Sequence, residues 1–250
     1  MLGFGVAAAA AAAVAVTATA FRSPVYLDAP HVAPPPPSAI AEPATKLELP
    51  TTITHRGSEL CLVGLGVRRV TFIGINVYVA GLYVERSAAE TAARAHAACA
   101  PNAESIDLEH QVREWLATGA TVGVRIVPVR ATEFTHLRDG LVRAANTRGK
   151  AIADDSDASR EYGAGVRALK SIFPHTKVSR GSTLDLLAKS DGNGYRLDVV
   201  FDGKPLGSVM GSGVAAVPVE LMLAYVGERP DISAALRANV RKHLFGGLAA

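Results

Sequence analysis

Two adjacent arginines, Arg68 and Arg69, stand in a segment whose other residues suit burial in a β-sheet. Successive residues of a strand point to opposite faces of the sheet, so only one of the two can face whatever covers it. No carboxylate lies between Leu60 and Val84 to pair with that arginine. A buried, unpaired guanidinium costs roughly several kcal/mol, so we expect Arg68 to meet either a distant acid or an anionic ligand.

Tyr78 is the second candidate for a binding residue. It stands among Val77, Val79 and Ala80 in the strand expected next, and a buried phenol needs a hydrogen-bond partner. A guanidinium and a phenol facing one apolar cavity can hold a carboxylate or an enolate by charge-assisted hydrogen bonds, while hydrocarbon walls hold the tail. The alternative is a structural ion pair between Arg68 and an acid elsewhere in the chain, such as Glu59, Glu133, Asp139 or Glu220.

Other kinds of chemistry have less support in the sequence. The seven histidines are scattered without HxxxH or HExxH spacing, so no divalent metal site is expected. His136, on an expected helix beside the sheet, is the better candidate for a special role, although a partly solvated helix histidine is the simpler interpretation. The net charge is only +3 and the basic residues are spread along the chain, which argues against a nucleic-acid partner.

The elements that position these residues follow from hydrophobic periodicity. Residues 59–85 predict two strands with a turn at Gly74, because β-branched and aromatic residues dominate. Further strands are expected at 121–129, 183–189, 195–201 and 204–210, and helices at 87–100, 105–117, 130–148, 159–173, 214–226 and 231–244. Strands and helices do not alternate strictly, which predicts an α+β domain with an antiparallel sheet and helices on one face.

The first fifty residues divide into two expected parts. Residues 1–22 form an apolar, alanine-rich leader whose first 21 residues carry no charge, just long enough as a helix to span a bilayer. We interpret this leader as a membrane anchor or sorting segment, with a cleaved signal and an inert low-complexity tail as the alternatives. Residues 23–50 hold eight of the fourteen prolines, which predicts an extended linker before a folded domain at 51–250.

The segments around the candidate residues resemble the chalcone isomerase superfamily. Residues 66–68 and 76–85 are similar to the family's arginine strand and the strand after it, and 125–130, 134–140 and 224–233 add support. Together with the leader, they are most similar to the fungal mitochondrial branch, the "altered inheritance of mitochondria" proteins. The resemblance implies an open-faced sandwich of an antiparallel sheet layered with helices, in a mitochondrial protein tethered to the inner membrane through residues 1–21.

The same resemblance implies a site that keeps the family's catalytic arginine, as Arg68, and little else. Tyr78 replaces a threonine of the plant isomerases. Four further polar positions of those enzymes fall on apolar residues here, namely Phe134, Leu137, Leu141 and Ala224. The lost groups orient the substrate for cyclisation. An arginine with a tyrosine instead resembles the family's fatty-acid-binding members, which implies a non-catalytic binder of a fatty acid or a similar apolar anion.

Two alternative functions share the same cleft. One is residual intramolecular lyase activity of the chalcone isomerase type, in which Arg68 would stabilise a developing enolate. The other is haem binding, with the propionates on Arg68 and an axial ligand from His136 or another side chain.

Overall fold

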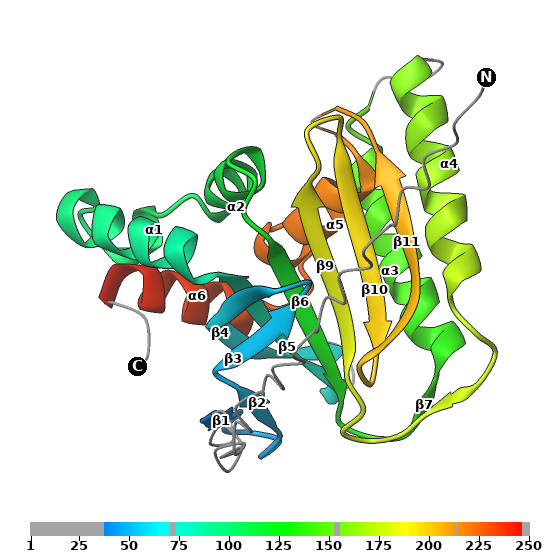
Figure 1. The fold of residues 1–250 in the computed structure, drawn as a ribbon. Helices are drawn as coiled ribbons and strands as arrows, with labels where there is room; N and C mark the ends of the chain where they lie inside the picture. The colour runs from blue at the N-terminus through cyan, green and yellow to red at the C-terminus, as the bar shows by residue number, and fades with distance from the viewer. Residues whose placement is uncertain (1–37, 71–73, 153–155, 214, 247–250) are drawn as a thin grey trace, which may run out of the picture. The chain divides into compact units, whose positions relative to one another are not determined.

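The computed structural model describes residues 38–70, 74–152, 156–213 and 215–246, and Figure 1 shows their fold. Its main feature is a seven-stranded antiparallel sheet in the order β11-β10-β9-β6-β5-β4-β3. The strands are β3 (Thr52–His55), β4 (Ser58–Val70), β5 (Ile75–Glu85), β6 (Val122–Pro128), β9 (Leu184–Ser190), β10 (Tyr195–Phe201) and β11 (Lys204–Gly211). The sequences of these strands are rich in apolar residues, many of them β-branched, and such residues favour strand formation.

Helices pack on one face of the sheet and bury the larger hydrophobic core against it. They are α1 (Arg86–Cys99), α2 (Leu108–Ala117), α3 (Phe134–Gly149), α4 (Asp157–Ile172), α5 (Val217–Val226) and α6 (Ala234–Gly246). Every residue of α5 is buried, so this helix lies at the centre of the helical layer. The arrangement confirms the predicted α+β class and the layering of helices on an antiparallel sheet.

The other face of the sheet curls around a smaller hydrophobic cluster, which includes Leu60, Tyr83 and Leu187. Asp198 of β10 lies on this face as the cross-strand neighbour of Leu187. Its carboxylate accepts hydrogen bonds from Arg56 at 2.7 Å and pairs with His55 at 3.0 Å, although β3 and β10 are far apart in the strand order. On the face of the smaller cluster, Asp198 therefore joins strand β10 to the end of strand β3.

The folded domain begins before residue 51, which corrects the predicted boundary. Strand β1 (Ala39–Ala41) pairs with β2 (Glu48–Pro50), and Leu49 of β2 is fully buried in the smaller cluster. The turn between them is held by Glu42, whose carboxylate accepts from the backbone N–H and the hydroxyl of Thr45. Pro43 lies within this turn, so the proline content that predicted a linker also suits a tight connection.

The predicted leader and most of the predicted linker lie outside the described residues. Within the ranges that the structure describes, no helix is long and apolar enough to cross a membrane.

The observed helix starts differ from the expected ones by one to four residues, as the first three helices show. Helix α1 begins at Arg86, one residue before the expected start, and its N-cap Glu85 makes no side-chain capping hydrogen bond. Helix α2 begins only after Asp107, which accepts a hydrogen bond from the N–H of His110. Helix α3 begins at Phe134 because the two residues before it form β7 (Thr132–Glu133), paired with β8 (Lys177–Val178).

Candidate functional site

Strands β4 and β5 place Arg68 and Tyr78 directly opposite each other, on the face that the helices cover. Arg68 Nη1 donates a hydrogen bond to the Tyr78 phenol oxygen at 3.2 Å. The guanidinium carbon lies 5.5 Å from the centre of the Tyr78 ring, which is within cation–π range. Strand alternation therefore brings together the two residues that the sequence singled out.

Arg68 forms no ion pair within the part of the chain that the structure describes. Three of the four acids considered as partners are paired elsewhere: Glu59 with Arg86, Asp139 with Arg138, and Glu220 with Arg113 and Arg148. The fourth, Glu133, accepts a hydrogen bond from the Thr135 hydroxyl. Arg69 is exposed and donates to the side-chain oxygen of Asn76 at 2.9 Å, as expected of a solvated neighbour.

A second phenol, Tyr225, completes the polar end of the site, and the sequence reasoning missed it. Tyr225 lies in α5 and is fully buried, and its hydroxyl is 3.3 Å from that of Tyr78. Burial raises the pKa of Tyr225 well above its usual value, although Arg68 opposes the shift. Tyr225 lies within residues 224–233, which carried part of the resemblance, but the residue singled out there was Ala224, which is buried and does not line the cavity.

These three polar residues line one cavity of about 260 Å³. Helix α3 lines the cavity with one face, on which Leu137, Gly140, Leu141 and Ala144 lie three or four positions apart. The apolar walls are Val77, Ile126, Leu137, Leu141, Ala144 and Ile232, and Thr132, His136, Asp139, Gly140 and Arg143 complete the lining. A polar end formed by a guanidinium and two phenols, with hydrocarbon walls, suits a small amphipathic anion.

Gly140 lets α3 pass close to the guanidinium. A Cβ atom added at this glycine would lie 3.4 Å from Arg68 Nη1. Glycine inside a helix costs about 1 kcal/mol relative to alanine. Glycine at position 140 weakens the helix, but it leaves space beside the Arg68 guanidinium that a larger residue would fill.

The apolar replacements noted in the sequence are buried in the structure. Leu137 and Leu141 line the cavity itself. Phe134 packs against Phe201 with ring centres 4.6 Å apart and against Phe173 at 6.2 Å. At these places the structure offers hydrocarbon and aromatic surface, which cannot orient a polar substrate by hydrogen bonds.

His136 lies at the cavity but is exposed, with Nδ1 3.3 Å from the Thr132 hydroxyl. A haem needs an axial ligand that reaches its iron inside the binding site. His136 is exposed and its Nδ1 is engaged by Thr132, so it does not offer a ligand held inside the cavity. Among the described residues, no cluster of three His, Cys, Asp or Glu side chains could hold a metal ion.

Comparisons with known proteins agree with this architecture. A protein from Debaryomyces hansenii named "Altered inheritance of mitochondria protein 18, mitochondrial" is 25% identical over 77% of this chain and 69% of its own length. The protein of the same name from Kluyveromyces lactis is 26% identical over 59% of this chain, and the match spans about half, 51%, of that relative. The crystal structure of a fatty-acid binding protein from Arabidopsis thaliana superposes with a TM-score of 0.63 at 19% identity, covering 84% of this chain and all of that one.

The fold and the cavity define a class of α+β domain in which helices layer on an antiparallel sheet and an arginine heads an apolar cavity. The family model described as "Chalcone isomerase like" matches residues 58–241, and the chain belongs to that family. The resemblance noticed in the sequence is thereby confirmed.

Proposed function

We propose that this protein is a non-catalytic binder of a fatty acid or a similar amphipathic monocarboxylate. The carboxylate would lie against Arg68 and Tyr78, and the hydrocarbon would lie along Leu137 and Leu141. The single observation that carries the proposal is a partly buried Arg68 with no ion pair in the described residues, at the head of an apolar cavity. A carboxylate would supply the missing negative charge.

The hydroxyl hydrogen bonds at this end of the cavity favour an anion. Among the described residues, the only hydrogen-bond partner of the buried Tyr225 hydroxyl is Tyr78. Either hydroxyl of this pair can be the donor, and we propose that Tyr225 donates to the Tyr78 oxygen, which satisfies the buried Tyr225 proton. Because Arg68 donates to the same oxygen, the Tyr78 proton is left for the ligand. The site therefore presents donors and positive charge at one end.

The relatives support this proposal and a mitochondrial location. The Arabidopsis thaliana neighbour is described as a fatty-acid binding protein, and the fungal relatives carry "mitochondrial" in their names. We extend both properties to this chain as part of the proposal. Tethering to the inner membrane through residues 1–21 rests on the sequence alone.

Isomerase activity has weaker support than binding. Cyclisation needs polar groups that hold a ketone and a phenoxide in line, and leucines stand where the resemblance places two of those groups. Arg68 alone would stabilise an enolate without orienting the attack.

The proposal is tested by purifying the full-length protein, extracting it with organic solvent and analysing the extract by mass spectrometry, beside an absorption spectrum. We expect a fatty acid in the extract and no Soret band. A Soret band would instead indicate haem. A protein that carries no carboxylic acid and cyclises chalcone would contradict the binding proposal.

A further inference from the structure

A larger cavity lies between α1 and α2, and it shares no lining residue with the cavity at Arg68. It measures about 640 Å³, within the range typical of ligand pockets. We call it the α1–α2 groove. Its α1 wall is formed by Ala88, Ala92 and Ala95, and the space exists because these side chains are small.

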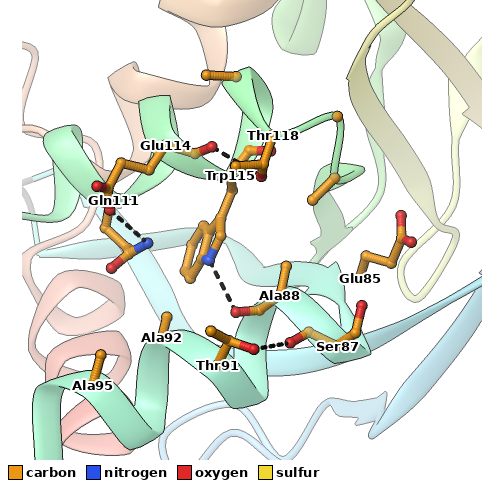
Figure 2. Close-up of a pocket in the computed structure, with 13 residues that line it drawn as sticks. Glu85, Ser87, Ala88, Thr91, Ala92, Ala95, Gln111, Glu114, Trp115 and Thr118 are labelled. Atoms are coloured by element: carbon orange, nitrogen blue, oxygen red, sulfur yellow. Dashed lines mark hydrogen bonds between the residues drawn. The ribbon is translucent and has the colours of Figure 1, made fainter.

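Trp115 of α2 forms the aromatic centre of the groove. Figure 2 shows its indole between the two helices, where Nε1 donates to the carbonyl of Ala88 at 3.3 Å. The residue is only 3% exposed, so its ring is fixed rather than free to adapt. The small part of the indole that reaches the groove and the alanine wall beside it give the groove an apolar lining.

The charged residues that line the groove are both acids, Glu85 and Glu114. Glu85 is 3.9 Å from Lys189, and Glu114 is 3.3 Å from His110, and neither of these basic residues lines the groove. The side chain of Glu114 is 55% exposed and that of Glu85 is 32% exposed, so both carboxylates keep room for a further partner.

The neutral polar groups of the groove are largely engaged within the protein. The hydroxyls of Thr91 and Thr118 donate to carbonyls of their own helices. The Gln111 amide donates to Glu114, and its oxygen is 2.7 Å from the ring of His96. Carboxylate acceptors are therefore what the groove has left to offer a ligand, together with its apolar wall and its indole.

We propose that the α1–α2 groove binds an amphipathic organic cation, which is an ammonium group on a hydrocarbon body. The ammonium group donates to the Glu114 carboxylate by a charge-assisted hydrogen bond. The hydrocarbon body lies along the wall formed by Ala92 and Ala95 and touches the edge of Trp115. This site is independent of the carboxylate site at Arg68.

Trp115 is the only tryptophan of the chain, so its fluorescence reports on the groove directly. The test titrates the full-length protein at neutral pH with n-octylamine, n-octanol and octanoate. We expect a saturable change in Trp115 fluorescence with the amine, and affinities at least about tenfold weaker for the alcohol and the acid, since a charge-assisted hydrogen bond is lost.

Two matched substitutions locate the binding. Ala95 and Ala97 are both exposed on α1, but only Ala95 lines the groove. Ala95→Leu should abolish the response to n-octylamine, and Ala97→Leu should leave it unchanged. Glu114→Gln should weaken it about tenfold, and Arg68→Ala should have no effect.

Three outcomes would overturn the proposal. They are no saturable response to the amine, equal affinities for the amine and the alcohol, or an unchanged response in Ala95→Leu. Because Arg68→Ala serves as a separate arm, failure of the groove is distinguishable from failure of the carboxylate site.

Discussion

At the scale of single residues, the polar end of the cavity is formed by two side chains that meet at the hydroxyl of a third, Tyr78. Arg68 donates to Tyr78, and Tyr225 reaches the same hydroxyl from the buried helix α5. The pKa of Arg68 is raised: burial acts against the shift, and the interactions with Tyr78 and Tyr225 outweigh it. The guanidinium is thus charged at any physiological pH. The cavity therefore carries a positive charge at every physiological pH, and this charge can pair with a carboxylate.

The hydroxyl pair gives the first prediction. Tyr78→Phe should weaken binding of a fatty acid roughly tenfold, because the ligand loses one donor. The same change should lower the free energy of unfolding by about 1–3 kcal/mol, because the buried Tyr225 hydroxyl loses its acceptor. Isothermal titration calorimetry and urea unfolding measure the two effects.

The double variant Tyr78→Phe/Tyr225→Phe separates stability from binding. Replacing both partners of a buried hydrogen bond by apolar groups is nearly neutral, so stability should recover while binding stays weak. A double variant less stable than Tyr78→Phe alone would show that the two hydroxyls are not each other's main partners.

At the scale of elements, helix α3 gives up stability to leave room beside Arg68. Gly140→Ala should raise the free energy of unfolding by up to about 1 kcal/mol through helix propensity. The new methyl group would lie 3.4 Å from Arg68 Nη1, so it should also crowd the carboxylate and weaken fatty-acid binding. Thermal unfolding and calorimetry on the same samples test both halves of this prediction.

Gly163→Ala is the matched control in helix α4. A Cβ atom there would meet only the flexible end of Arg167 at 3.5 Å. It should stabilise the protein without changing binding. If Gly140→Ala bound fatty acid as tightly as Gly163→Ala, the space beside Arg68 would have no role in the site.

Strand alternation and cross-strand pairing account for what the sequence could predict at this scale. They predict that Arg68 and Tyr78 share one face of neighbouring strands, and the two residues are cross-strand partners. The sequence could not show that Tyr225 faces the cavity, because α5 is buried on all sides and has no polar face that would reveal its orientation. The start of α3 was missed because β7 pairs with β8, a contact more than forty residues along the chain that local sequence does not encode.

At the scale of the described domain, the curl of the sheet is held closed at Asp198. Burial acts to raise the pKa of this carboxyl, but hydrogen bonds from Arg56, Arg196, His55 and Ser208 outweigh it and hold the pKa well below its usual range. A depressed folded-state pKa contributes stability at a pH above the unfolded value of about 3.9, and this contribution is lost as the pH falls through the folded value.

The pH dependence gives a prediction for the domain. We expect the free energy of unfolding to fall below about pH 4, and Asp198→Asn to reduce both that slope and the stability at neutral pH, by about 1–2 kcal/mol. The expected loss of stability is modest because the Arg56 side chain is 59% exposed and solvent screens its pairing with Asp198. Urea unfolding at a series of pH values measures this, and an unchanged slope in Asp198→Asn would assign the acid sensitivity to other carboxylates.

The start of the domain shows how composition misled the sequence-based boundary. Eight prolines before residue 51 predicted a linker, yet Leu49 is buried and β1 pairs with β2. Burial of one leucine against a sheet formed by distant strands is a tertiary effect, which proline content cannot report.

The central claim is that Arg68 holds the carboxylate of an apolar ligand, and the adjacent arginines provide the most direct test. Calorimetric titration of octanoate into the wild-type protein, Arg68→Ala and Arg69→Ala should show saturable binding that Arg68→Ala weakens at least about tenfold and Arg69→Ala leaves unchanged. Equal loss in both variants would indicate non-specific charge attraction. Unchanged binding in Arg68→Ala would contradict the account.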